Sequence, residues 1–202
     1  MMSRDNLIIS IGQRLYNTIF FPLRVLLKHS HVKWLGLISL QEERISICKR
    51  YSQGKVLDMG CGDQNLFIKT VGRGIGLDLY PWKGINICSD GTQLPFKDQV
   101  FDTIAFLGSL NYLRDVEAVL RETHRVLDKE GVVLIVQSNP IIGFLRLKLC
   151  WWIPYRHECY GFWKREIENL LERTGFLLTS RVSFLFSLNK LYIAQKEKGR
   201  DG

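Results

Sequence analysis

The sequence lacks paired cysteines, a long apolar run and any internal repeat, and these absences exclude several classes of protein. Its five cysteines include no Cys-x-x-Cys pair, which argues against a disulfide framework and against a structural zinc site. No apolar run reaches the ~20 residues that a membrane-spanning helix needs, and the N-terminus lacks the layout of a signal peptide. We therefore expect a cytoplasmic protein, in a reducing compartment, without a bound metal.

What is present is an ordinary globular composition with a basic charge. The 202 residues are 46% hydrophobic and 24% charged, which suits one domain of common size. A formal charge of +8 suits an anionic partner such as an acidic substrate, an anionic lipid surface or nucleic acid. The basic residues are spread along the chain rather than clustered with aromatic residues, so nucleic acid is not the expected partner.

Residues 1–53 have the pattern of an N-terminal helical cap. Pro22 ends or kinks a first helix, a second helical stretch covers 23–27, and a third helix covers about 40–51. No acidic residue occurs between Asn6 and Gln41, so this segment is basic as well as apolar. The apolar positions of the first helix recur at helical spacing: Leu7, Ile8, Ile11, Leu15, Ile19 and Phe20.

Over residues 54–202, short apolar strands alternate with helices. This alternation predicts an α/β fold with a doubly wound, mostly parallel seven-stranded sheet. Segments 176–186 and 190–195, joined by a turn at 187–189, indicate a C-terminal antiparallel hairpin. Gly131 is expected to cap the helix before the fifth strand. The remaining strands are expected over 55–59, 74–79, 85–89, 101–107 and 132–136, and the helices over 65–71, 115–128 and 163–174.

Three successive strands of this pattern end in an aspartate. Asp58 ends the first strand and is followed by a turn in which Gly60 and Gly62 allow the backbone to approach a ligand closely. Asp78 ends the second strand about 20 residues later, where a carboxylate can accept both hydroxyls of a ribose. Asp90 ends the third. The alternative is that these acids cap helices and turns, a common use of aspartate.

These motifs resemble those of the class I S-adenosylmethionine-dependent methyltransferases, and most of all their small-molecule branch, called type 11. The resemblance covers about Lys55 to Gln137 and implies an enzyme that uses S-adenosylmethionine as methyl donor. The motifs are Asp-Met-Gly-Cys-Gly at 58–62, Gly-Leu-Asp-Leu-Tyr-Pro at 76–81, Ser-Asp-Gly-Thr-Gln-Leu-Pro-Phe at 89–96, Phe-Asp-Thr-Ile at 101–104 and Arg-Val-Leu-Asp-Lys-Glu-Gly-Val-Val-Leu-Ile at 125–135.

The resemblance also implies which residues hold the donor. The glycine turn would line the methionine half with Asp58 behind it, Asp78 would bind the ribose hydroxyls, and Asp90 the adenine amino group. Leu79, Leu94 and Leu107 would enclose the adenine ring. The full set of expected donor-binding residues is Asp58, Gly60, Cys61, Gly62, Asp78, Leu79, Asp90, Gly91 and Leu107.

Two departures from the family pattern leave other interpretations open. Gln64 stands where the turn usually carries a third glycine, and residues 108–112 read Gly-Ser-Leu-Asn-Tyr where the family often has Glu-His. A donor-binding or scaffold protein without catalysis is therefore an alternative. A nicotinamide dinucleotide domain is a further one, but its motif would need glycine at Asn65 and does not explain Asp90.

The acceptor is expected to be a small molecule of apolar or lipid-like character. Methyl transfer depends mainly on alignment of the acceptor with the methyl group, and a general base is needed only for an acceptor of high pKa. Asn111, Tyr112 and His157 are the candidates for acceptor contact or catalysis. His157 lies in an insertion, about 140–162, that is rich in large apolar residues. This insertion either covers an apolar acceptor or completes the core.

The sequence also suggests roles for the other histidines and contact with a membrane surface. His29 and His31 are expected to be exposed, and His124 to be structural. The helical cap and the insertion share a basic, apolar character, so peripheral contact with an anionic membrane is a further hypothesis. The motif of amino-directed nucleic-acid methyltransferases is absent after the fourth strand, which again disfavours nucleic acid as the acceptor.

Overall fold

The computed structural model describes residues 16–20, 29–140, 162–184, 187 and 189–197. Its contacts divide the chain into two compact units, Met1–Ile47 and Cys48–Gly202. The division falls inside a helix, whereas the sequence pattern changes near Gly54. The organisation into a helical cap and a second domain therefore stays a prediction. No helix in the described part of the chain is long and apolar enough to cross a membrane.

The described part of the first unit is helical. It contains a helical turn at 16–19, helix α3 (His29–Trp34) and the beginning of helix α4 (Leu40–Tyr51). The sequence predicted α4 with these bounds but did not predict α3. Ser39 and Glu42 begin α4 with a reciprocal cap, because the Ser39 hydroxyl accepts the Glu42 N–H and the Glu42 carboxylate accepts the Ser39 N–H. The predicted stretch at 23–27, and the first helix before residue 16, lie outside the described residues.

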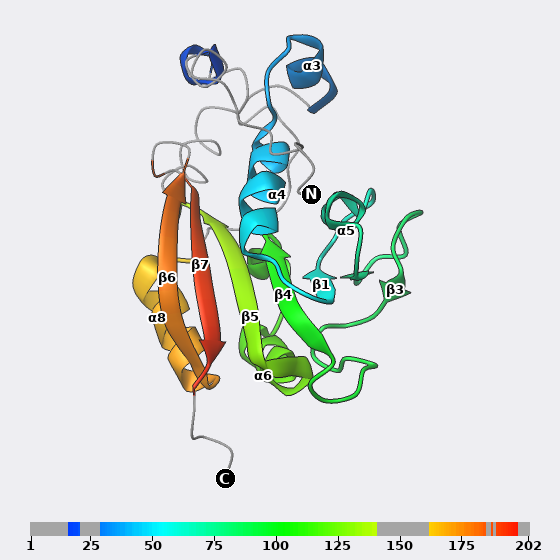
Figure 1. Cartoon of the computed structure of the whole chain (residues 1–202), viewed down its shortest axis with the longest axis vertical. Coiled ribbons are helices and arrows are strands. Elements are labelled where there is room, and N and C mark those ends of the chain that lie inside the picture. The colour runs from blue at the N-terminus through cyan, green and yellow to red at the C-terminus, as the bar shows by residue number, and fades with distance from the viewer. Residues whose placement is uncertain (1–15, 21–28, 141–161, 185–186, 188, 198–202) are drawn as a thin grey trace, which may run out of the picture. The chain divides into compact units, whose positions relative to one another are not determined.

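The second unit is built on one seven-stranded sheet with the order β3-β2-β1-β4-β5-β7-β6 (Figure 1). The first five strands run parallel, and β7 is antiparallel to both β5 and β6. The predicted fold class is confirmed, including the C-terminal hairpin. The elements are β1 (Val56–Met59), α5 (Leu66–Val71), β2 (Ile75–Asp78), β3 (Ile87–Cys88), β4 (Phe101–Leu107), the short 3-10 helix η1 (Leu110–Tyr112), α6 (Val116–Val126), β5 (Leu127–Ser138), α8 (Lys164–Arg173), β6 (Phe176–Phe184) and β7 (Asn189–Lys196).

The expected helix cap at Gly131 was wrong. Helix α6 ends at Val126, and Leu127 already has extended backbone angles and pairs with Phe101 of β4. Gly131 lies inside β5, which is longer than the sequence predicted at its N-terminal end. Leu127 pairs with Phe101 and Val132 pairs with Thr103, so the strand continues through residues 128–131, where its register with β4 shifts.

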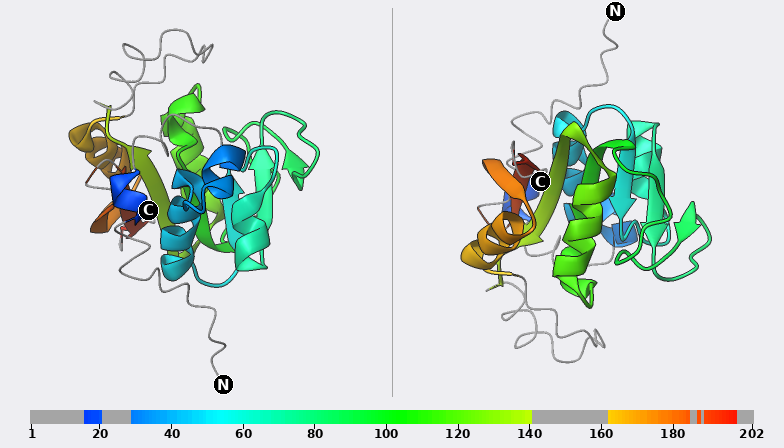
Figure 2. Two further views of the ribbon diagram at one scale, coloured as in Figure 1. Left: turned by 90° about the horizontal axis from the view of Figure 1, so that it is seen from above. Right: turned by 90° about the horizontal axis from the view of Figure 1, so that it is seen from below.

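Side chains of alternate residues on four neighbouring strands form the main hydrophobic core. Because successive side chains of a strand point to opposite faces, these residues share one face of the sheet. Helices α6 and α8 cover this face from the same side (Figure 2), and their apolar residues belong to the same cluster. The cluster residues that alternate along these four strands are Leu57 and Met59 of β1, Ile104 and Phe106 of β4, Val133 and Ile135 of β5, and Tyr192 and Ala194 of β7.

We predict that Gly74→Ala lowers the free energy of unfolding much more than Gly72→Ala does. Gly74 has φ +124°, and a Cβ there would lie 2.1 Å from the carbonyl oxygen of Val56 in β1. Gly72 also has a positive φ, but a Cβ there would meet nothing within 4 Å. We expect losses of about 3 kcal/mol or more for Gly74→Ala and about 1 kcal/mol for Gly72→Ala. Urea unfolding of both variants measures this, and equal losses would contradict the close approach of residue 74 to β1.

Candidate functional site

The order of the strands places a site at the carboxyl ends of β1 and β4. These strands are neighbours and parallel, with Asp58 opposite Ala105. From β1 the chain continues toward β2 on one side, and from β4 it continues toward β5 on the other. Loops that leave in opposite directions open a crevice at the sheet edge, which is where open α/β sheets bind their ligands. The predicted site residues after β1, β2, β3 and β4 all belong to this edge.

The glycine turn after β1 is tied to the end of β2 by its backbone. The N–H groups of Gly60 and Cys61 both donate to the carbonyl of Leu77, at 2.8 and 3.1 Å. Gly60 and Gly62 have φ of +77° and +67°, which favours glycine at both positions. A Cβ on Gly60 would lie 2.4 Å from the Cβ of Ser109, whereas a Cβ on Gly62 would meet nothing within 4 Å. Gly60 therefore permits close approach of the loop after β4, and Gly62 leaves space for a ligand.

Asp78 is held rigidly at the end of β2. Its side chain is 9% exposed, and each carboxylate oxygen accepts one backbone N–H, from Gly62 at 2.9 Å and from Tyr80 at 3.1 Å. A carboxylate has about four acceptor positions, so two remain for a ligand. Beside it, the Leu79 side chain is 51% exposed. This arrangement leaves a fixed pair of acceptors next to an accessible apolar surface.

Asp58 is a buried carboxyl whose hydrogen bonding is incomplete. It is 3% exposed, and its Oδ1 atom has no hydrogen-bond partner among the described residues. Burial, and then the neighbouring Asp78 carboxylate, raise the pKa of Asp58 from 3.8 to about 7. A cationic or donor group beside Oδ1 would satisfy this atom and favour its ionised form.

Cys61 sits in the same turn and stays a thiol. Burial, with the carboxylates of Asp58 and Asp78, raises the pKa of Cys61 to about 12. Because only the thiolate is a strong nucleophile, Cys61 is suited to contact a ligand rather than to attack one. Its place in the expected donor-binding set is compatible with this state.

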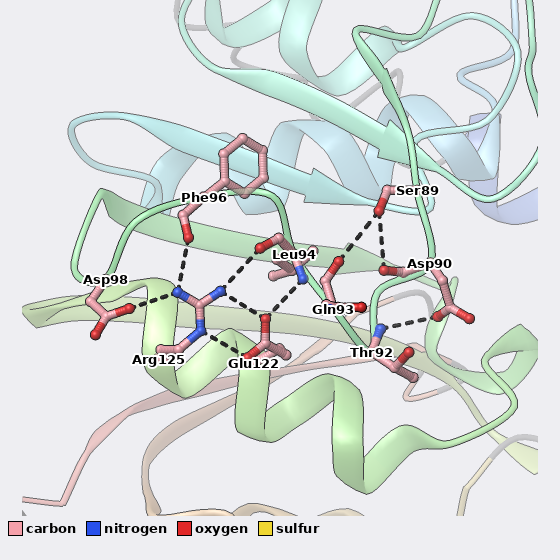
Figure 3. Close-up of polar contacts among 9 residues, drawn as sticks. All are labelled: Ser89, Asp90, Thr92, Gln93, Leu94, Phe96, Asp98, Glu122 and Arg125. Atoms are coloured by element: carbon pink, nitrogen blue, oxygen red, sulfur yellow. Dashed lines mark hydrogen bonds and ion pairs between the residues drawn. The ribbon is translucent and has the colours of Figure 1, made fainter.

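The loop after β3 brings Asp90 and Gly91 to the same edge. The Ser89 N–H donates to the carbonyl of Asp78 at 3.0 Å, and the Asp90 carboxylate accepts the Thr92 N–H at 3.0 Å (Figure 3). Asp90 is exposed. Gly91 is buried, and a Cβ there would lie 2.9 Å from the Met59 side chain. The loop therefore packs on the core while its carboxylate stays accessible.

A pair of charged residues on α6, Glu122 and Arg125, holds the rest of this loop (Figure 3). Glu122 accepts the Leu94 N–H at 2.8 Å, and Arg125 donates to the carbonyls of Leu94 and Phe96 and to the Asp98 carboxylate. The two side chains also bond each other, which holds the pKa of Glu122 below its ordinary value despite burial. The sequence analysis assigned these two residues no role. Their opposite charges, three residues apart on a predicted helix, could have indicated an ion pair.

The three leucines expected around an adenine ring differ in their exposure. Leu79 is exposed and Leu107 is half-buried, so both side chains are accessible at the edge. Leu94 is 4% exposed and packs in the hydrophobic core. Its part in enclosing a ring stays a prediction.

The loop after β4 carries two of the three acceptor candidates. Asn111 is half-buried and Tyr112 is exposed, both on η1. The Ser109 hydroxyl donates to the carbonyl of Met59, which joins this loop to the turn after β1. Asn111 Oδ1 accepts a hydrogen bond of 2.9 Å from Nε2 of Gln137, a buried residue at the end of β5 that sequence reasoning did not single out.

The histidines fall in different places. His157, the third candidate, lies outside the described residues. His31 is exposed, as expected. His124 is half-buried and meets the ring of Phe176 edge-on, with ring centroids 5.2 Å apart, which fits its expected structural role. In the described ranges, no group of three His, Cys, Asp or Glu residues is placed to hold a metal ion.

Asn65 supports the turn in a way that sequence reasoning missed. Its backbone is left-handed, with φ 48° and ψ 45°, a conformation that asparagine tolerates better than most residues. Its side-chain amide donates to the Gly84 carbonyl and to Asn86, whose Oδ1 also accepts the Gly76 N–H. Asn65 rather than position 64 therefore takes the unusual backbone conformation just before α5.

Similarity to known proteins agrees with this architecture. Residues 39–181 match a family of methyltransferase domains. Demethylmenaquinone methyltransferase of Streptomyces griseus is 35% identical over 83 residues, which cover 41% of this chain and 31% of that protein. An uncharacterized protein of Methanocaldococcus jannaschii is 33% identical over 109 residues, which cover 48% of this chain and 42% of that protein. The chain thus matches less than half the length of either relative.

Among solved structures, an S-adenosylmethionine-dependent methyltransferase from Thermotoga maritima has the same fold. Its TM-score is 0.68 at 18% identity, and the alignment covers 94% of this chain and 100% of that one. The family match runs from the start of α4 into β6 and so includes the glycine turn and the loops after β2, β3 and β4. The resemblance inferred from the sequence motifs is confirmed: the chain belongs to the methyltransferase domain family, and this membership implies S-adenosylmethionine as its methyl donor.

Proposed function

We propose that this protein transfers a methyl group from S-adenosylmethionine to a small acceptor of apolar, lipid-like character. The observation that carries the proposal is the pair Asp58 and Asp78 beside an open glycine turn, in a chain of this family. The relatives named demethylmenaquinone methyltransferases support an acceptor of the quinone type. The large apolar residues between positions 140 and 162 of the sequence support the same choice.

The donor-binding residues fit the chemistry of a nucleoside. Asp78 has two free acceptor positions and would take the ribose hydroxyls, while the exposed Asp90 carboxylate would accept the adenine amino group. The side chains of Leu79 and Leu107, with the backbone at Gly91, would line the adenine ring. Because both aspartates are fixed by backbone N–H groups, they would bind without a large loss of side-chain entropy.

The methionine half of the donor fits the turn after β1. The open space at Gly62 and the backbone of Gly60 and Cys61 would receive it. Its ammonium group would supply the partner that the buried Asp58 Oδ1 lacks, and this would return the Asp58 pKa toward its ordinary value. When bound, the donor supplies an activated methyl group on a sulfonium. The chain's own part is then to orient the acceptor and exclude water.

Acceptor contact is assigned to the loop after β4. Asn111 and Tyr112 would touch the acceptor, and His157 is the candidate for a base if the acceptor must lose a proton. Cys61 stays protonated near the donor and takes no part as a nucleophile. A donor-binding scaffold without catalysis is the competing interpretation, because residues 108–112 lack the Glu-His often found in the family.

We predict that Asp78→Ala weakens binding of S-adenosylhomocysteine by about 1–3 kcal/mol, because it removes charged hydrogen bonds to the ribose. Isothermal titration calorimetry measures this loss. The matched control is Asp63→Ala, which removes an exposed carboxylate from the same turn and should leave the affinity unchanged. Equal affinities for all three proteins would mean that Asp78 does not hold the ribose.

We predict that Asp58→Asn raises the free energy of unfolding by about 4 kcal/mol at pH 8 and by less than half as much at pH 5. The unfolded carboxyl titrates near 3.8 and the folded one near 7, so the folded protein binds the extra proton between these values. The unsubstituted protein therefore loses stability as the pH rises through this window, by up to about 4 kcal/mol. Urea unfolding of the ligand-free proteins at both pH values measures it, with Asp63→Asn as the control. The same difference at pH 5 and pH 8 would show that Asp58 does not titrate in this range.

We predict that the protein forms S-adenosylhomocysteine when it is given S-adenosylmethionine and a reduced, short-chain demethylmenaquinone. Mass spectrometry of the quinone should show one added methyl group. Asp78→Ala should slow the reaction at low donor concentration, and Asp63→Ala should not. Donor binding without product from this acceptor, or from a panel of phenols and quinols, would favour the scaffold interpretation.

A further inference from the structure

Two facing amides, on Asn111 and Gln137, lie at the carboxyl edge on the acceptor side of the glycine turn. Gln137 is next to last in β5, whose residue Val136 pairs with Leu107 at the end of β4. The chain leaves β4 through residues 108–109 and reaches Asn111 on η1. Neighbouring parallel strands therefore deliver both side chains to one place.

This place is adjacent to the donor end of the proposed site. The Ser109 hydroxyl donates to the Met59 carbonyl, and its Cβ is the atom that a Cβ on Gly60 would strike at 2.4 Å. The loop that carries Asn111 is thus packed directly against the turn proposed to hold the methionine half. An acceptor aligned with the methyl group would lie beside this loop.

The amide pair is only half hydrogen-bonded. Two facing amides can form two hydrogen bonds, each donating to the other. Here Gln137 Nε2 donates to Asn111 Oδ1 at 2.9 Å, but Gln137 Oε1 has no partner among the described residues. The Gln137 side chain is 3% exposed, so this oxygen is also cut off from solvent. A buried acceptor without a partner is uncommon and calls for a ligand or water that completes it.

This single bond leaves one donor and one acceptor on the two joined amides. Asn111 uses Oδ1 to accept from Gln137, so its Nδ2 group remains as the donor, and Gln137 Oε1 remains as the acceptor. A hydroxyl group is both an acceptor and a donor, and it can bridge such a pair. A methoxy group or a carbonyl can accept from Asn111 but cannot donate to Gln137.

We propose that the Asn111–Gln137 pair recognises a ring hydroxyl of the acceptor, which accepts from Asn111 Nδ2 and donates to Gln137 Oε1. This deepens the proposed function and rests on it, since it selects the reduced, hydroxyl-bearing form of a quinone-type acceptor over the oxidised form. Gln137 orients Asn111 as a positioning residue and also touches the hydroxyl. The pair thereby gives the site specificity for phenols and quinols.

The test measures binding of 1-naphthol and 1-methoxynaphthalene to the protein saturated with S-adenosylhomocysteine, by ligand-observed NMR titration. The unsubstituted protein should prefer 1-naphthol by about tenfold. Gln137→Met fills the same space but removes the acceptor for the hydroxyl proton, so it should abolish the preference. Asn111→Asp keeps the size of the side chain and its bond from Gln137 but removes the donor, so it should weaken the binding of 1-methoxynaphthalene, which can only accept.

Matched controls distinguish loss of hydroxyl recognition from misfolding of the site and from the effect of an added negative charge. Asn169→Asp makes the same chemical change at an exposed position on α8 and should keep the preference. Affinity for S-adenosylhomocysteine should stay within about twofold in both test variants if the site remains folded, and so should affinity for 1-methoxynaphthalene in Gln137→Met.

Each outcome decides the proposal. Loss of the preference in Gln137→Met and weaker binding of 1-methoxynaphthalene to Asn111→Asp, neither of them seen in Asn169→Asp, support it. A preference that survives in Gln137→Met overturns it, and so does unchanged binding of 1-methoxynaphthalene to Asn111→Asp or equal or absent binding of the two probes to the unsubstituted protein. Hydroxyl preference without methyl transfer to any quinol would contradict the proposed function while leaving the amide pair as a binding site.

Discussion

The proposed donor site of this protein depends on the backbone hydrogen bonds that join the turn after β1 to the end of β2. Gly60 and Cys61 share the Leu77 carbonyl, and Gly62 donates to the Asp78 carboxylate. These bonds hold two carboxyl groups close together at a sheet edge, one fully buried and one with free acceptor positions. The raised pKa of Asp58 is the electrostatic result of that proximity and burial. The edge is therefore arranged for a ligand that carries both positive charge and hydroxyl groups.

The remaining loops of the edge are fixed by groups outside the sheet. Glu122 and Arg125 hold the loop after β3 from helix α6, and the Asn65 amide holds the turn from the other side through Gly84 and Asn86. Each bracing group bonds backbone carbonyls or N–H groups, so it restrains the course of the chain rather than a single side chain. Such restraint favours a preformed binding site.

Much of this arrangement was predictable from the sequence. The strand-end aspartates and the glycine turn were predicted to lie together at one sheet edge, and the parallel order of β1, β2 and β3 places them there. The sequence could not show that Asn65 would take the left-handed conformation, since position 64 is where the family pattern has its glycine. It also gave no reason to select Gln137, which lies at the end of an apolar strand. Only the structure shows that its side chain bonds Asn111 in the loop after β4. The sequence pattern also did not show that β5 would continue through Gly131, between the paired residues Leu127 and Val132.

The protonated thiol of Cys61 has a further consequence. A sulfonium donor is an alkylating agent, and a thiolate in the turn proposed to hold it would be alkylated in place of the acceptor. Two adjacent carboxyl groups and burial keep the sulfur in its weakly nucleophilic form across the physiological range. The same electrostatics make this cysteine a poor target for peroxide, so the proposed donor site would resist both alkylation of its own sulfur and oxidation.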